Sequence, residues 1–244
     1  MARTGFLHHL GTFFLFAATV LLIITDISAP VVSSISLLKV DLGGDHRPTY
    51  FRDEDNERFP GITFGTFGYC TQDIRSSGLI SCSDSMIGYD PAAVVKGSLG
   101  GGDLSDYAHD TAKALTKVMI LHPIATGLAF IAFLMSLGAG VVGSFLASLG
   151  SLITFVVVLV VLITDFVCFS IIKSNINEAD NNVRAHWGAA SWTTLVAAIL
   201  CLFATIILFF TCCSARLHRR RDSRHHETKM APSQSPPRRR FRLF

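Results

Sequence analysis

One apolar block constrains this chain more than any other feature. Residues 118–172 run for 55 positions between Lys117 and Lys173 with almost no charge. A continuous helix of that length would extend roughly 80 Å, whereas the hydrocarbon core of a bilayer is about 30 Å thick. The block must therefore fold back on itself. Glycines at positions 138, 140 and 143 lie near its middle, where a turn is needed and helix propensity is weakest. We expect a helical hairpin in a membrane.

Two more stretches, around residues 6–27 and 188–213, are long and apolar enough to cross the hydrocarbon. Half of all residues are hydrophobic and only 16% are charged, and the apolar residues come in blocks rather than alternating. We therefore predict an all-α membrane protein with a four-transmembrane-helix bundle. The predicted segments are a cytoplasmic N-terminus (1–5), span one (6–27), an extracellular loop domain (28–116), span two (117–137), a cytoplasmic turn (138–147), span three (148–171), a short extracellular loop (172–187), span four (188–213) and a basic, disordered cytoplasmic tail (214–244).

Charge sets the orientation. Residues 26–116 carry 13 acidic and 7 basic side chains, whereas residues 214–244 carry 10 Lys or Arg against two acidic side chains. The positive-inside rule places the basic tail, and with four spans also the N-terminus, in the cytoplasm. A cleaved signal peptide is the alternative for the first span, but the sequence after it is a poor cleavage site. The long loop faces outward in both cases.

The long loop is expected to hold a small β-containing domain. Residues 31–40 are rich in β-branched side chains, and residues 62–69 alternate aromatics with glycine, so each stretch predicts a strand. The charged stretch 45–57 is expected to be a mobile loop tip, and 105–117 to be helical and continuous with span two.

Cys70 and Cys82 are the two cysteines outside the spans on the oxidising side, so we expect a disulfide, with two free thiols as the alternative. Cys212 and Cys213 precede the basic tail, a position that suits S-palmitoylation and that plain boundary cysteines explain equally well. The tail side chains are expected to lie on anionic lipid, or to serve only for orientation; they begin with Arg216, Arg219, Arg220 and Arg221.

His122 and Asp165 are the ionisable residues inside the central block, at similar depth below the outer surface. Buried charges are costly unless they are paired, so we expect the two side chains to be in contact. Such a pair either holds two helices together or responds to external pH, since histidine titrates in the physiological range.

The sequence contains no phosphate loop, no zinc-protease motif and no nucleophile elbow, so we expect no enzyme activity, no cofactor and no metal site. The spans have fewer polar residues than a transporter or pore usually needs. Nucleic-acid binding is not expected of a membrane-tethered tail. Small residues Gly143, Ala147 and Ser151, spaced four apart, are suited to close helix approach, to a partner or to a second copy of the chain.

The segment Phe64-Gly65-Thr66-Phe67-Gly68-Tyr69-Cys70 resembles the signature of the first external loop in the fungal PalI family. The stretch 117–127, with its Leu-His-Pro-Ile-Ala, is similar to that family's opening of span two. The resemblance extends over almost the whole chain, although the tail here is shorter than in many PalI proteins.

The resemblance implies a claudin-like bundle of four helices under a small external sheet held by one disulfide, here at Cys70 and Cys82. It implies a plasma-membrane accessory protein in ambient, alkaline-pH signalling, which helps a seven-span pH sensor reach or stay at the cell surface. The alternative, from a related branch, is a structural organiser of eisosome-type cortical membrane domains and the cell wall.

Overall fold

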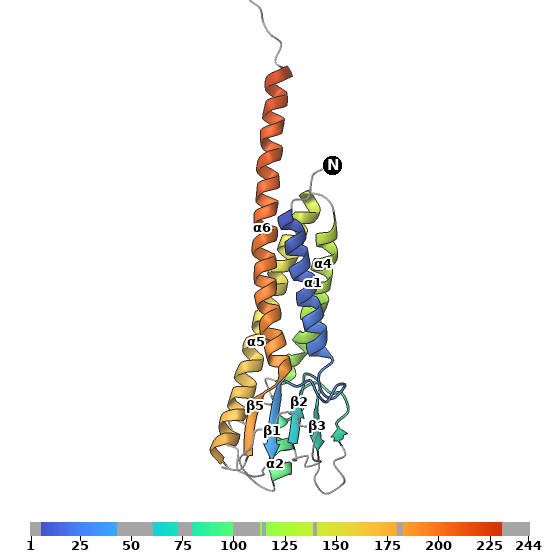
Figure 1. Ribbon diagram of the computed structural model, residues 1–244, viewed down its shortest axis with the longest axis vertical. Coiled ribbons are helices and arrows are strands. Elements are labelled where there is room, and N and C mark those ends of the chain that lie inside the picture. Colours follow the sequence, from blue (N-terminus) through green and yellow to red (C-terminus); the bar gives the residue numbers. More distant parts are fainter. Residues whose placement is uncertain are drawn as a thin grey trace, which may run out of the picture.

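The computed structural model describes residues 6–42, 61–72, 80–99, 113, 116–138, 141–179 and 183–230. Four long helices lie side by side: α1 (Phe6–Asp26), α4 (Leu121–Leu137), α5 (Val141–Ala179) and α6 (Ala189–Met230) (Figure 1). A short 3-10 turn, η1 (Val118–Ile120), leads into α4. Helix α1 packs between α4 and α6, and α5 packs between the same two helices on the other side. All four helices are long and apolar enough to cross a membrane, which confirms the four-span prediction.

The bundle has small residues inside and large apolar residues outside. Its centre is lined by buried alanines, among them Ala18, Ala125, Ala129, Ala197 and Ala204, and many Phe, Ile and Leu side chains point outward and are about half exposed. A water-soluble bundle has the opposite arrangement, because water drives large apolar side chains inward. In lipid, close approach of small residues is what holds helices together. This arrangement is that of a multi-pass membrane protein.

A five-stranded antiparallel sheet lies at one end of the bundle, with strand order β4-β3-β2-β1-β5 (Figure 1). The strands are β1 (Leu38–Leu42), β2 (Gly61–Phe64), β3 (Tyr69–Gln72), β4 (Ile80–Cys82) and β5 (Val183–Trp187). One face of the sheet is apolar and packs against the outer part of α5 and against α2 (Pro91–Leu99). The buried side chains of this core include Val40, Ile62, Phe64, Phe169 and Ile172.

Three of the predicted strands and loops differ from the structure. The stretch 62–69 is two strands joined by a turn, in which Gly65 N–H donates to the carbonyl of Gly68. The stretch 31–40 becomes a strand only from Leu38. The predicted loop 172–187 is mostly helix and strand, because α5 continues to Ala179 and β5 completes the sheet by pairing with β1.

The helix ends also differ from the prediction. Helix α5 begins at Val141, so the predicted turn 138–147 is much shorter. Helix α6 continues to Met230, which contradicts the predicted disorder over residues 214–230. The reason is that a helix already nucleated in the span propagates at low cost through good helix formers, and no proline interrupts it before position 232. The predicted loop tip 45–57 and most of the stretch 105–117 lie outside the described residues.

Candidate functional site

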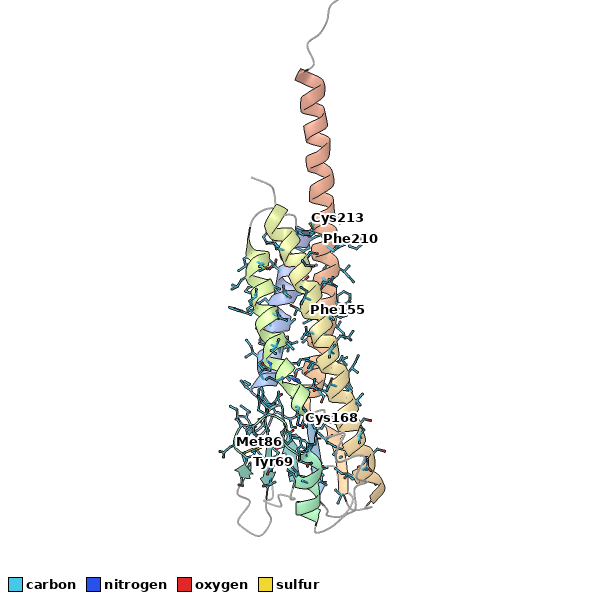
Figure 2. All side chains as sticks on the ribbon, turned by 180° about the vertical axis from the view of Figure 1, so that it is seen from behind. Tyr69, Met86, Phe155, Cys168, Phe210 and Cys213 are labelled. Carbon is cyan, nitrogen blue, oxygen red and sulfur yellow. A yellow bond between two sulfur atoms is a disulfide. The ribbon has the colours of Figure 1, made fainter. Side chains whose placement is uncertain are left out.

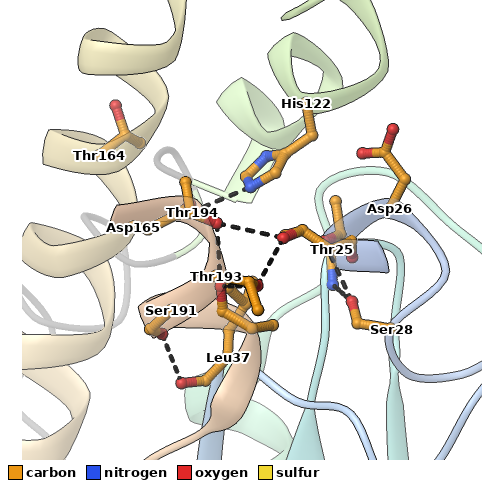
Figure 3. Close-up of polar contacts among 12 residues, drawn as sticks. Thr25, Asp26, Ser28, Leu37, His122, Thr164, Asp165, Ser191, Thr193 and Thr194 are labelled. Carbon is orange, nitrogen blue, oxygen red and sulfur yellow. Dashed lines mark hydrogen bonds and ion pairs between the residues drawn. The ribbon is translucent and has the colours of Figure 1, made fainter. Parts of the chain in front are cut away.

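The most distinctive site is a buried polar layer where the bundle meets the sheet (Figure 3). At its centre the Nε2–H group of His122 on α4 donates to Oδ2 of Asp165 on α5, at 3.1 Å. Each side chain is only 1% exposed. The structure thus brings the two intramembrane ionisable residues together, with the geometry of a hydrogen bond between helices.

Helix α1 contributes a third ionisable group to this layer. Thr126 lies one turn after His122, and its hydroxyl is 2.6 Å from Oδ2 of Asp26, the last residue of α1. Asp26 and His122 are close enough to interact electrostatically. The second oxygens of the two carboxylates, Oδ1 of Asp26 and Oδ1 of Asp165, accept no hydrogen bond from the described residues. Three helices therefore meet through one linked set of polar groups.

Helix α6 joins the layer through hydroxyl groups. The Oγ1 atom of Thr25 lies 2.9 Å from that of Thr193 and 3.4 Å from that of Thr194. Two residues before Thr193, the hydroxyl of Ser191 donates to the carbonyl of Leu37, directly before β1, at 2.8 Å. The start of α6 is therefore bonded both to the end of α1 and to the sheet.

The Phe-Gly-Thr-Phe-Gly-Tyr-Cys segment forms the turn that docks the sheet on the bundle. Thr66 donates through its hydroxyl to the carbonyl of Thr25 at 3.1 Å, and through its N–H to Oγ of Ser28 at 3.0 Å. A Cβ atom at Gly65 would overlap the backbone of Ala29, so only glycine allows this approach. The signature is thus explained by close contact between the β2–β3 turn and the end of α1.

The other residues of the signature have separate structural roles. Phe64 is fully buried in the sheet core, and Tyr69 begins β3. Phe67 is half-buried in the turn. Gly68 lies against Pro30 and the hydroxyl of Ser83, where a larger residue would collide.

Tyr89 also contacts the β2–β3 turn. Its hydroxyl donates to the carbonyl of Gly65 at 2.7 Å, and its own carbonyl accepts from the hydroxyl of Thr116, just before η1. Burial raises the pKa of the Tyr89 phenol well above its ordinary value, with further contributions from the neighbouring Cys168 and Asp165. Tyr89 is therefore held in its neutral, hydrogen-bond-donating form.

Cys70 and Cys82 form a disulfide between β3 and β4, which confirms that prediction. Cys168 is buried in the core between α5 and the sheet, and Cys201 is buried inside the helix bundle. At the opposite end of the molecule, beside Phe210, Cys213 is exposed whereas Cys212 is buried (Figure 2). The side chains of Arg216, Arg219, Arg220 and Arg221 lie outside what the structure describes.

The small residues at the start of α5 are used inside the chain. Ala147 and Ser151 are fully buried, and Ala147 belongs to a core cluster with Leu15 and Leu208. This face of α5 is therefore occupied by the chain's own helices. Within the described residues, no three His, Cys, Asp or Glu side chains come together in a way that could hold a metal ion.

Sequence reasoning missed several members of the polar layer. Asp26 ends the first apolar stretch at the end of the bundle where His122 and Asp165 lie, and that position was a usable signal. Thr25, Thr66 and the serines gave no signal, because short hydroxyl residues are common at helix ends and turns.

Comparison with known proteins agrees with this architecture. A family model described as the SUR7/PalI family matches residues 7–204, which include the sheet, the first three spans and most of the fourth. The chain belongs to the SUR7/PalI family. The resemblance seen in the sequence is therefore confirmed.

Two curated relatives in the SUR7/PalI family have functional names. The "pH-response regulator protein palI/RIM9" of Pyricularia oryzae is 31% identical over 125 residues, 50% of this chain and 13% of that protein. The "pH-response regulator protein palI/prr-5" of Neurospora crassa is 30% identical over 155 residues, 64% of this chain and 19% of that protein. The match thus covers less than a fifth of each of these longer proteins.

Proposed function

We propose that this SUR7/PalI chain is a non-enzymatic accessory protein in ambient-pH signalling at the plasma membrane. Its role is to assist the localisation or stability of a seven-span pH sensor. The observation that carries the proposal is that both curated relatives are named pH-response regulators. The family model covers the sheet and most of the bundle, so we assign the role to this folded part.

The architecture supports a role in binding other membrane proteins. The bundle presents large, half-exposed side chains to the membrane along every helix, such as Phe130, Ile163 and Phe203. The sheet is joined to the bundle by hydrogen bonds of the polar layer and by the pairing of β5 with β1, so a partner can contact the spans and the sheet domain together. A polytopic partner would bind these surfaces through its own spans and outer loops, and self-association would use the same surfaces.

The proposed orientation has both termini in the cytoplasm and the sheet outside the cell. The basic residues after Cys213 favour the cytoplasmic side. The disulfide lies in the sheet at the other end of the bundle, and disulfides persist in oxidising compartments. Both features agree with the same orientation.

The test of the function is deletion of the gene, with the sensor followed by fluorescence at the cell surface and growth scored at alkaline pH. We expect the sensor to be lost from the surface and growth at alkaline pH to fail, and both to be restored by the wild-type chain. Normal sensor placement together with an abnormal cortex would reject this function.

The role of His122 and Asp165 within that function is to hold α4 against α5 at the outer end of the bundle. The groups facing this pair are Asp26 from α1, and Tyr89 and Cys168 beside Asp165. The alternative is that the pair senses external pH. A His122→Gln strain distinguishes these roles, with His186→Gln on β5 as the control. A pH response unchanged in its midpoint removes the sensing role.

The cytoplasmic end is proposed to bind the inner leaflet. Cys213 is the exposed cysteine there, and acylation of Cys213 or Cys212 together with the following arginines would give two membrane signals. Thioester-selective capture of the wild-type protein, with Cys213→Ser and Cys212→Ser as comparisons, tests this. Absence of a hydroxylamine-sensitive thioester in the wild type rejects acylation.

A second candidate function is that of a structural organiser of cortical membrane domains and the cell wall. It is favoured by the family itself, which unites SUR7 and PalI proteins and does not separate them for this chain. Clustering of the tagged protein into static cortical patches, with normal alkaline growth of the deletion strain, is its expected signature.

A further inference from the structure

Several large apolar side chains outside the membrane spans are exposed on one side of the sheet domain. Val31 is 67% exposed, Ile87 53% and Met86 44%. We call these three residues, with Ile27 and Ile120, the membrane-proximal patch. Exposed apolar side chains that gather in one place mark an interaction surface, whereas scattered ones do not.

One hydrogen bond and one close approach place two members of the patch beside the same turn. The N–H of Met86 donates to the carbonyl of Phe67 in the β2–β3 turn, at 2.8 Å. The neighbouring turn residue, Gly68, lies against Pro30, which directly precedes Val31. Met86 and Val31 therefore flank the same turn, the turn that docks on the end of α1. Figure 2 shows Met86 at the side of the molecule, where the sheet meets the bundle.

The other end of the patch reaches span two. Gly88, next to Ile87, lies against the side chain of Lys117. Lys117 is exposed, and Ile120, one turn further along, is 41% exposed. The segment 83–88 thus runs along the outer end of the bundle from α1 to α4.

The patch is the direct continuation of two lipid-facing stripes. On α1 the exposed residues Val20 and Ile23 lead, at helical spacing, to Ile27 directly after the helix end, and the exposed Val31 follows in the turn beyond it. On α4 the exposed Ile124 leads back to Ile120. Both stripes lie on membrane-spanning helices and therefore face lipid. The patch thus borders a lipid-facing surface at each of its two ends.

We propose that the membrane-proximal patch lies in the outer leaflet, with Met86, Ile87 and Val31 at the boundary between acyl chains and headgroups. The 83–88 segment then acts as an interfacial anchor that fixes the depth and tilt of the sheet domain. Lys117 stands at the same level, where its ammonium group reaches the lipid phosphates while its methylene stem covers apolar surface. This proposal is independent of the signalling role.

The test is fluorescence quenching by lipid in the full-length protein, reconstituted in phosphatidylcholine vesicles. Ile87→Trp places a reporter in the patch. Ile80→Trp is the matched control, because Ile80 is also an isoleucine of the sheet domain and is 50% exposed. Ile80 pairs with Gln72, at the end of β3 away from the docking turn. This places it roughly 10 Å further out than Tyr69 at the usual strand rise.

Phosphatidylcholine brominated in the upper acyl chain serves as the quencher, and the unsubstituted protein supplies the background of Trp187 and Trp192. The added fluorescence of Ile87→Trp is expected to fall roughly twofold or more, as for a ring at the membrane interface. That of Ile80→Trp is expected to stay unchanged. A closed disulfide and a monodisperse elution profile establish that both variants are folded.

Three results would overturn the proposal. Absence of quenching at position 87 places the patch in water. Equal quenching at both positions means that the whole sheet lies on the bilayer and that the patch is not an anchor. Protection of the position-87 reporter from both brominated lipid and aqueous acrylamide means that protein, such as a second copy of this chain, covers it.

Discussion

Replacing His122 and Asp165 one at a time should cost unequal amounts of stability. The two side chains are 3.1 Å apart and almost fully buried, so neither can turn to water when its partner is removed. Asp165→Val leaves an imidazole that can stay neutral, and the loss is one unsatisfied polar group, about 1–3 kcal/mol. His122→Leu leaves a carboxyl group that must either be charged in a low dielectric or take up a proton. That loss is about 3–5 kcal/mol by analogy with broken buried ion pairs.

The double variant should be more stable than His122→Leu alone. Replacing both partners by apolar side chains of similar size removes the unsatisfied group as well as the hydrogen bond. The coupling energy in a double-mutant cycle must then exceed the cost of Asp165→Val alone, about 1–3 kcal/mol, which lies above the usual value for hydrogen-bonded pairs in membrane bundles. Unfolding by sodium dodecyl sulfate in mixed micelles, followed by circular dichroism at fixed pH, measures each variant.

Thr164→Val is the matched control for this cycle. Thr164 is next to Asp165 but faces away from the pair, and its hydroxyl bonds within its own helix to the carbonyl of Val160 (Figure 3). It should change stability by less than about 0.5 kcal/mol. If His122→Leu and Asp165→Val cost the same stability, and the double variant costs their sum within about 0.5 kcal/mol, the reasoning is refuted. The two residues would then act independently.

Three further outcomes follow from the sheet domain. Gly65→Ala should destabilise the fold by about 3 kcal/mol or more through backbone overlap, whereas Gly127→Ala, which meets no atom within 4 Å, should stabilise it by about 0.5–1 kcal/mol in thermal unfolding. Removing the disulfide by Cys70→Ser and Cys82→Ser together should lower the free energy of unfolding by about 3 kcal/mol, the loop-closure entropy expected for a loop of this length. An unchanged melting temperature would contradict this. The raised pKa of Tyr89 means that above pH about 10 the unfolded chain loses its proton first, so stability should fall as the pH rises, and Tyr89→Phe should weaken that dependence.

The sequence was sufficient to predict the four spans, the contact between His122 and Asp165, and the disulfide. Four spans follow from runs of apolar residues, because the length and hydropathy of a span are set by the bilayer and not by its neighbours. The contact of His122 with Asp165 follows from their equal depth in a hairpin. The disulfide was predicted because Cys70 and Cys82 lie together outside the spans, on the side that the charge distribution predicts to be oxidising.

Which segments pair to form the sheet was decided by the tertiary structure. By sequence, residues 183–187 look like part of a polar connection. They form strand β5 because they pair with the free edge of β1, more than 140 residues earlier. Asp26 joins the polar layer only because α1 packs against α4, which brings it to Thr126. The need for glycine at position 65 likewise depends on Ala29 lying against it. Hydropathy is a property of each segment, whereas edge pairing, polar contacts and close approach are properties of two distant segments brought together by folding.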